Sequence, residues 1–195
     1  MKITGDRTGE MQEELIRFGR KLAAAGLTHS RFGNMSVRMG DRILITKSGS
    51  ILEELEEAQL VEVDLLQAGS SDRIASTETI VHRAIYRATS AGAVIHSHSP
   101  FAVIVSLIAQ EDLLVPLDCE SLGCLREIPI VAAPPGSAEL AEKAAAALAD
   151  HKACIIRGHG PIATGQGVAE AFVNICSVEH ACRVKYHVDL ARQGP

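Results

Sequence analysis

Short apolar runs alternate with amphipathic stretches along this chain, and the alternation limits the folds open to it. Residues 11–25 predict a helix, because apolar residues from Leu15 to Ala25 recur at helical spacing. Further helices are expected over 77–89, 100–109, 137–150 and 167–192, and strands over 34–37, 42–46, 60–65, 93–96, 113–117, 128–131 and 153–156. The β-branched residues of 100–109 leave a strand possible there. Strands and helices mixed in this way predict an α/β fold with a layered core.

Length and composition indicate one globular domain. The chain has 195 residues, so a single domain over residues 1–195 is expected. Apolar residues make up 47% and charged residues 22%, which is typical of a globular protein. The net charge is -5 and aromatic residues are only 3%, with no basic stripe. Nucleic acid is therefore not an expected partner.

The same composition favours the cytoplasm. Residues 1–10 are polar and charged, unlike a signal peptide, and the longest apolar run, 101–109, is too short to span a bilayer. The five cysteines include no CxxC pair, so a disulfide framework is not expected. We therefore expect a cytoplasmic protein that does not enter a membrane.

Two histidines stand two residues apart at the expected end of a buried strand. His96 and His98 follow Val94 and Ile95 and precede Pro100. Because alternate residues of a strand point to the same face, both imidazoles would project together from this strand end. Such a pair can bind a metal ion, and ordinary packed histidines are the alternative.

A third histidine, His159, follows another apolar run and is flanked by Gly158 and Gly160. Three imidazoles with an open fourth position are typical of a catalytic site for zinc or a similar divalent ion. His98 and His159 are far apart in the sequence, which leaves open whether the three rings meet.

Three further segments contain residue types that suit an anion. Gly33-Asn34 precedes a strand, Ser48-Gly49 lies in a turn, and Ser76-Thr77-Glu78 opens a helix. Glycine permits close backbone approach, and the free amides and hydroxyls of a helix start favour phosphate. Each segment alone also fits a turn or a helix cap. Beside a metal, Glu78 could be a ligand or could carry a proton.

The order of these segments resembles that of the class II aldolase and epimerase family, in the form found in fuculose-phosphate aldolase. The resemblance runs from about residue 11 to residue 192, and its most specific parts are the two histidine segments and the Ser-Thr-Glu helix start. The matching segments are Gly33–Arg38, Ile45–Ser50, Ser76–Arg87, Ala93–Val103 and Ile155–Gly165.

This resemblance implies a role for each segment. His96, His98 and His159 would hold one divalent ion per subunit, usually zinc, with Mn²⁺ or Co²⁺ as alternatives. Glu78 would be the catalytic acid and base, and would ligate the metal in the resting state. The substrate phosphate would be bound by Asn34, Ser48, Gly49, Ser76 and Thr77.

The resemblance also implies the fold, the reaction and the assembly. Members of the family have a three-layer α/β/α domain around a largely antiparallel sheet, and usually form homotetramers with active sites at subunit interfaces. The implied substrate is a phosphorylated sugar, a ketose 1-phosphate of fuculose- or deoxypentulose-phosphate type. Reversible cleavage would give dihydroxyacetone phosphate and an aldehyde, with Glu78 moving the proton at the carbon that becomes nucleophilic.

The chain departs from the fuculose-phosphate aldolase pattern at two tyrosines of that enzyme. Glu120 stands in the place of one, and no tyrosine follows the expected final helix. Glu120 is therefore a candidate substitute acid, with a surface carboxylate as the alternative. A sugar-phosphate epimerase or decarboxylase of the same family is the alternative function. A noncatalytic adaptor domain, which typically loses the histidines or the glutamate, is the third.

Overall fold

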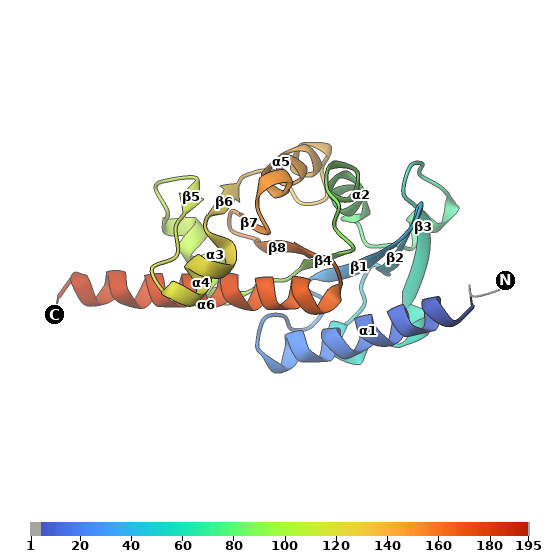
Figure 1. Cartoon of the computed structure of the whole chain (residues 1–195), viewed down its shortest axis with the longest axis horizontal. Coiled ribbons are helices and arrows are strands. Elements are labelled where there is room, and N and C mark those ends of the chain that lie inside the picture. The colour runs from blue at the N-terminus through green and yellow to red at the C-terminus, as the bar shows by residue number, and fades with distance from the viewer. Residues whose placement is uncertain (1–4, 195) are drawn as a thin grey trace.

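A mixed sheet of eight strands runs through the described part of the chain (Figure 1). The computed structural model describes residues 5–194. Residues 1–4 and residue 195 lie outside the described residues. The predicted domain over residues 1–195 includes all five of them, and the N-terminal segment expected not to be a signal peptide, residues 1–10, includes residues 1–4. The strands are β1 (Asn34–Met39), β2 (Arg42–Thr46), β3 (Leu60–Asp64), β4 (Ala93–His96), β5 (Leu113–Leu114), β6 (Ile128–Val131), β7 (Ala153–Ile156) and β8 (Gly160–Gly165).

The strand order is β3-β2-β1-β4-β8-β7-β6-β5. Neighbouring strands pair antiparallel except β6 and β7, which run parallel. The prediction of an α/β domain with a largely antiparallel sheet is therefore confirmed, and the parallel pair is a detail that the sequence pattern did not predict.

Six α-helices and three short 3-10 turns complete the described residues. The α-helices are α1 (Gly5–Ala24), α2 (Thr79–Ala88), α3 (Pro100–Ile108), α4 (Cys119–Leu125), α5 (Ala138–Asp150) and α6 (Val168–Arg192). The 3-10 turns are η1 (Leu52–Glu54), η2 (Glu57–Gln59) and η3 (Ser70–Arg73). Within residues 5–194, no helix has both the length and the apolar character that crossing a membrane requires.

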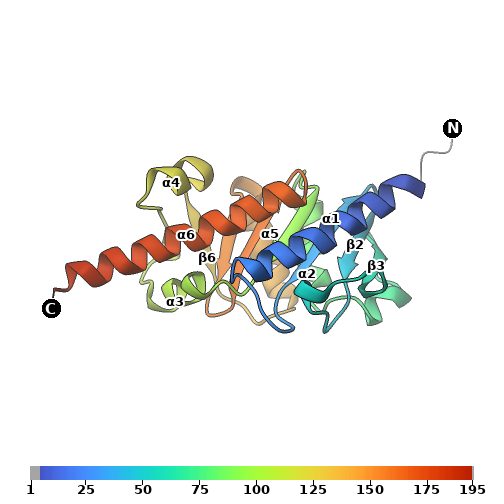
Figure 2. The same cartoon turned by 90° about the horizontal axis from the view of Figure 1, so that it is seen from below.

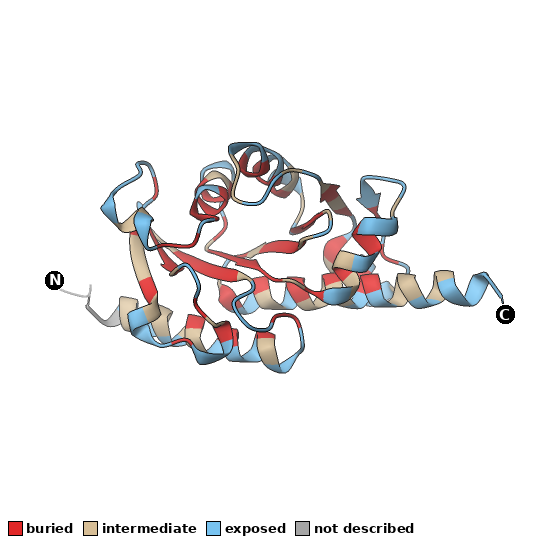
Figure 3. Cartoon of the chain, turned by 180° about the vertical axis from the view of Figure 1, so that it is seen from behind, coloured by how far each residue is buried: buried red, intermediate tan, exposed pale blue. Residues whose placement is uncertain are grey.

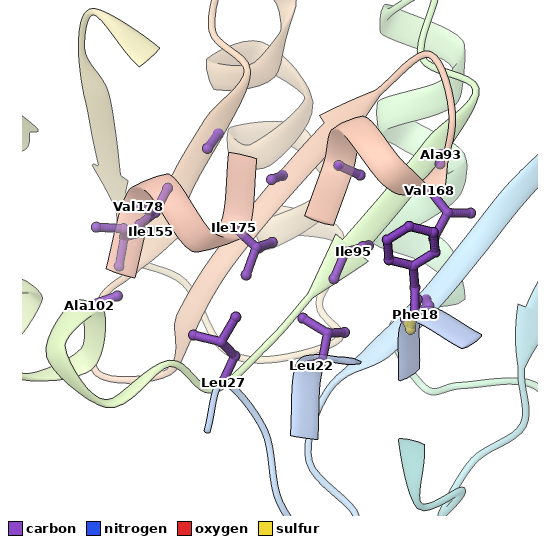
Figure 4. Close-up of a cluster of buried hydrophobic side chains, with 14 of the residues drawn as sticks. Phe18, Leu22, Leu27, Ala93, Ile95, Ala102, Ile155, Val168, Ile175 and Val178 are labelled. Carbon is purple, nitrogen blue, oxygen red and sulfur yellow. The ribbon is translucent and has the colours of Figure 1, made fainter. Parts of the chain in front are cut away.

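Helices pack on both faces of the sheet. On one face α2 and α5 lie together over a buried cluster that includes Ile43 and Val94. On the other face α1 and α6 lie side by side, as Figures 1 and 2 show. Figure 4 shows that Leu22 of α1 and Ile175 of α6 meet over Ile95 of β4. Because Val94 and Ile95 are neighbours on β4, that strand contributes to both cores.

Burial follows the expected periodicities. The strands are mostly buried in Figure 3, whereas the C-terminal turns of α6 are largely exposed. Leu15, Phe18 and Leu22 of α1 recur every three or four residues and form its buried stripe. The predicted cap of α5 is confirmed, because Ser137 Oγ accepts from Leu140 N at 3.0 Å.

The segment that could have been a strand, residues 100–109, forms the helix α3. Pro100 occupies its first turn, where a missing N–H costs little. Glu179 of α6 accepts from the backbone N–H of Phe101 at 3.0 Å and of Ala102 at 2.9 Å. A carboxylate at the start of a helix satisfies orphan donors and interacts well with the helix dipole. Contact with α6 therefore favours helix over the β-branched preference.

The start of β8 approaches the segment after β4 very closely. Ser97 N donates to Pro161 O at 3.1 Å. Gly160 has φ of 145°, and a Cβ at this position would overlap the carbonyl oxygen of Ser97. Only glycine suits this conformation and this close approach. The contact holds the turn before β8 against the residues that follow β4.

We expect Gly160→Ala to lower the free energy of unfolding by roughly 1–3 kcal/mol, because alanine is strained at this φ and collides with the Ser97 backbone. Urea unfolding measures the change. Gly167→Ala is the matched control, since Gly167 has extended backbone and no described atom lies within 4 Å of an added Cβ. The control should change stability by less than about 1 kcal/mol. A Gly160→Ala protein as stable as its control would contradict the account.

Candidate active site

Three chain segments meet at the ends of β1, β4 and β7. His96 is the last residue of β4 and pairs across the sheet with Asn34, the first residue of β1. On its other side His96 pairs with Ile162 of β8. The tight turn between β7 and β8 carries His159, and His98 lies just beyond β4. The fold therefore brings the three histidines together at one end of the central strands.

The imidazoles of His96, His98 and His159 converge. One ligand atom from each lies within 4.8 Å of the others, and His96 Nε2 is 3.2 Å from His98 Nε2. His96 Nδ1 lies 3.0 Å from the carbonyl oxygen of Pro161, which accepts the proton of that nitrogen. The lone pair of His96 is then left on Nε2, the atom that faces the other rings. This group can bind a metal ion.

The protonation of the rings suits a cation. Burial lowers the pKa of His98 to about 3, and the charges of His96 and His159 act in the same direction. Burial also lowers the pKa of His159 to about 4. Both rings are therefore neutral near pH 7, and the neutral imidazole is the form that binds a metal.

Glu78 lies against this group and is only 4% exposed. Its Oε2 is 3.6 Å from His96 Nε2 and its Oε1 is 3.9 Å from His159 Nδ1. Burial raises the pKa of Glu78, but His96, the hydrogen bond from Asn34 and His159 together outweigh it, so the pKa is lowered. The carboxylate is therefore ionised near neutral pH.

Two buried atoms in the group have no hydrogen-bond partner among the described residues, Glu78 Oε1 and His159 Nδ1. Leaving such atoms unpaired is costly, so they point to a group that would pair with them. Neutral imidazoles beside an ionised carboxylate form a donor set that fits a divalent cation. The residues present therefore fit a metal ion.

The same pocket extends from the histidines to the segments expected to bind phosphate. It has a volume of about 230 Å³, and Glu78 and the three histidines line one part of it. The remaining lining residues are Arg31, Phe32, Gly33, Asn34, Lys47, Ser48, Gly49, Ser50, Ser76, Thr77 and Pro135. All five residues expected to bind phosphate are among them.

Backbone pairing explains how the two hydroxyl segments come together. Ser76 N donates to Thr46 O and Ser48 N donates to Ile74 O, each at 3.0 Å. These bonds place the turn at Ser48 next to the start of α2. Glu78 N also donates to Ser76 Oγ at 3.3 Å, so the hydroxyl and the carboxylate belong to one tight turn.

Several residues of the pocket were not predicted. Arg31 contributes positive charge that no sequence pattern indicated, whereas Lys47 could be considered from the sequence as a charge partner beside the Ser48-Gly49 turn, and its Nζ donates to Ala58 O at 2.6 Å. Phe32 stacks on His98 with ring centroids 4.8 Å apart and an interplanar angle of 8°. It covers one face of that imidazole and limits how the ring can turn. Nothing in its sequence context indicated this contact.

Glu120 lies outside this pocket. It belongs to α4, is exposed, and lines a separate surface hollow with residues of α6 that include Phe172 and Cys176. Within one chain the structure does not bring Glu120 to the histidines. The role of substitute acid predicted for it would need a second subunit.

Known proteins share this sequence pattern and fold. Residues 13–186 match the family described as the Class II Aldolase and Adducin N-terminal domain. The structure of L-fuculose-1-phosphate aldolase from Thermus thermophilus is similar, with 33% identity, a TM-score of 0.89, and coverage of 96% of this chain and 98% of that chain. A 5-methylthioribulose-1-phosphate/5-deoxyribulose-1-phosphate aldolase from Rhodospirillum rubrum is 33% identical over 87% of this chain and 77% of its own length.

Similar proteins also carry other activities. A 3-oxo-tetronate 4-phosphate decarboxylase from Pectobacterium atrosepticum is 28% identical over 88% of this chain and 81% of its own length. The chain spans only 19% of one further relative, a probable bifunctional methylthioribose-1-phosphate isomerase/methylthioribulose-1-phosphate dehydratase from Nocardia farcinica, with 38% identity over 53% of this chain. Similarity alone therefore does not select the reaction.

We expect His96→Ala to weaken zinc binding by more than about 100-fold, since loss of a supporting contact alone costs roughly 10- to 100-fold. Elemental analysis after zinc loading and dialysis measures it. His151→Ala is the control, because His151 lies at the end of α5 and its ring Nδ1 is bonded to Ala147 O. Full zinc content in His96→Ala would contradict the assignment of this ring as a ligand.

Proposed function

Because this chain belongs to the family of the Class II Aldolase and Adducin N-terminal domain, we propose that it is a metal-dependent aldolase. Its substrate is a ketose 1-phosphate of fuculose- or deoxypentulose-phosphate type. The reaction is the reversible cleavage of this sugar to dihydroxyacetone phosphate and an aldehyde.

One observation carries the proposal. A single pocket holds the three histidines and Glu78 at one part and the hydroxyl and glycine segments at another. An aldolase of this type needs both, since the phosphate anchors the substrate while the carbonyl end reacts. Arg31 and Lys47 add the positive charge that a phosphate dianion requires. The names of the aldolase relatives are consistent with this substrate class.

Different residues of the pocket would bind the metal, transfer the proton and bind the phosphate. A divalent ion held by His96, His98 and His159 would polarise the substrate carbonyl and make the adjacent C–H more acidic. Glu78 takes the proton from that carbon in the synthetic direction and returns it in cleavage. The phosphate is bound by the residues at the other part of the pocket, which fixes the distance between the reacting carbon and the carboxylate. These residues are Asn34, Ser48, Gly49, Ser76 and Thr77.

Two other functions are alternatives to the aldolase. An epimerase or decarboxylase of the same family would use the same metal and phosphate sites, and a decarboxylase is among the relatives. A noncatalytic adaptor is disfavoured, because Glu78 and all three histidines are retained and converge. Two similar proteins of 33% identity are aldolases by name, which is consistent with the aldolase, but a methylthioribulose-1-phosphate dehydratase is also 33% identical, so the products formed must decide among these reactions.

Further features belong to the same proposal. We propose that the metal is zinc and that the single domain has three α/β/α layers. We also propose that the protein is cytoplasmic and forms a homotetramer with active sites at subunit interfaces. In such an assembly Glu120 would act on the pocket of a neighbouring subunit. Its position on α4, exposed and away from its own pocket, is compatible with that role.

The direct test is to incubate the zinc-loaded protein with dihydroxyacetone phosphate and a panel of short aldehydes. Ketose 1-phosphate formation, followed by mass spectrometry, is the expected result. Exchange of deuterium from heavy water into dihydroxyacetone phosphate should occur even without aldehyde. If neither occurs, while sugar phosphates are epimerised or sugar acid phosphates lose carbon dioxide, the aldolase assignment is wrong.

Glu78→Gln should slow this deuterium exchange by roughly two to four orders of magnitude, the usual effect of removing a general base. Zinc content should stay near that of the wild type, because the three histidines remain. Glu139→Gln is the control, since Glu139 is exposed on α5 and pairs with Lys143. Unchanged exchange in Glu78→Gln would remove Glu78 from the proton-transfer role.

A further inference from the structure

A line of buried hydrogen bonds continues behind Glu78, away from the pocket. Asn34 Nδ2 donates to Glu78 Oε2 at 2.9 Å. On its other side, Asn34 Oδ1 lies 2.6 Å from His82 Nε2. Both polar atoms of the Asn34 side chain are therefore engaged, one by the carboxylate and one by the imidazole.

The line ends deeper in the core. His82 Nδ1 is 2.7 Å from Ser36 Oγ, and Ser36 Oγ is 2.8 Å from the hydroxyl of Tyr86. The Tyr86 hydroxyl also donates to the carbonyl oxygen of Ser36 at 3.0 Å. Ser36 and His82 have no exposed surface, and Tyr86 is 1% exposed. Neither water nor substrate can reach these groups from the pocket.

The repeat distances of a strand and a helix produce this arrangement. Asn34 and Ser36 are two residues apart on β1, about 6.6–6.8 Å along a strand. Glu78, His82 and Tyr86 are four residues apart, about 6 Å per step along a helix, and share one face of α2 or of the turn before it. The near-equal spacings let each strand residue lie between two helix residues.

The directions of the donors follow from the Glu78 end of the line, because the hydroxyls of Ser36 and Tyr86 can each donate or accept. At one end the NH₂ group of Asn34 faces Glu78 Oε2 at 2.9 Å, and because an amide NH₂ can only donate, the carboxylate accepts. Asn34 Oδ1 then faces His82 and requires a proton on Nε2. A neutral imidazole with its proton on Nε2 accepts at Nδ1, and Ser36 supplies that donor. The single hydroxyl proton of Tyr86 is then shared between Ser36 Oγ at 2.8 Å and the carbonyl oxygen of Ser36 at 3.0 Å, so no contact in the line lacks a proton.

The opposite tautomer breaks the match. With its proton on Nδ1, the His82 ring would need a donor at Nε2, where Asn34 Oδ1 lies, and the NH₂ group of the same amide faces Glu78 instead. The amide would then have to turn over and place Oδ1 against the carboxylate of Glu78. Two oxygens without a proton between them repel, so this state would loosen Glu78.

We propose that His82 is a positioning residue for Glu78, because its Nε2–H fixes the amide of Asn34 in the one orientation that donates to the carboxylate. The role of Glu78 in proton transfer rests on the function proposed above, whereas the tautomer and the amide orientation do not. Asn34 therefore holds the carboxylate in place as well as lining the phosphate part of the pocket.

The first test is spectroscopic and uses the full-length, zinc-loaded wild-type protein. Imidazole ¹⁵N chemical shifts identify which ring nitrogen carries the proton, and comparison with the spectrum of His82→Gln assigns the signals of His82. The expected result is a neutral ring protonated on Nε2. A His82 ring protonated on Nδ1 would overturn the proposal, whatever the activity of the protein.

The second test compares two near-isosteric variants. The amide of Gln reaches the place of Nε2 and can donate to Asn34, whereas the amide of Asn reaches only the place of Nδ1. His82→Asn should therefore slow deuterium exchange into dihydroxyacetone phosphate by about 10-fold or more, the equivalent of one lost hydrogen bond to a charged group. His82→Gln should stay within about 3-fold of the wild type, since that bond is kept.

Controls separate positioning from folding and from metal binding. Zinc content should be near the wild-type value in both variants, because His82 is neither one of the three clustered histidines nor a residue that lines the pocket. Thermal unfolding must show that both variants are folded at the assay temperature. Equal exchange rates in folded His82→Asn and His82→Gln would overturn the proposal.

The two proposals fail in different ways. If the wild type catalyses no exchange, the aldolase function fails, and the ¹⁵N spectrum still decides the tautomer of His82. If the wild type is active and the ring is protonated on Nδ1, only the positioning proposal fails.

Discussion

The ionised carboxylate of Glu78, buried beside three imidazoles, is the interaction on which the site depends. A buried charge is costly unless it is paired and hydrogen-bonded, and here the compensation comes from two sides. Asn34 donates from behind, while His96 and His159 lie in front. Glu78 Oε1 has no hydrogen-bond partner among the described residues, so the compensation is incomplete, and a cation bound by the histidines would complete it. In such an arrangement the fold holds the ligand atoms close together before a metal binds, which favours metal binding.

Much of this arrangement could be predicted from the sequence, because the informative residues are close together in the chain or follow a familiar order. The His-x-His pair at a strand end, the helices with regular apolar spacing and the segments lining the pocket were found in this way. β8 was missed because it contains two glycines and a proline, which have low strand propensity. It is a strand because β4 and β7 pair with it on both sides.

What could not be predicted depends on distant partners. α4 is short and contains Gly123, and it forms where Asp118 caps its start and α6 covers it. The stacking of Phe32 on His98 follows from a loop path that no local pattern specifies. The bond between His82 and Asn34 requires knowing that α2 packs over β1, although the four-residue spacing of Glu78, His82 and Tyr86 is visible once that pairing is known.

The position of Glu78 also links the two parts of the pocket. Only one residue separates it from Ser76, and the backbone of Ser76 is bonded to Thr46 next to the turn at Ser48. A phosphate bound at these hydroxyls would therefore act on the same short segment that carries the carboxylate. Because that segment is fixed by β2 on one side and by Asn34 on the other, a shift of either would move Glu78 relative to the histidines. Phosphate binding and proton transfer should therefore respond together to changes in this segment, even though their chemical groups are different.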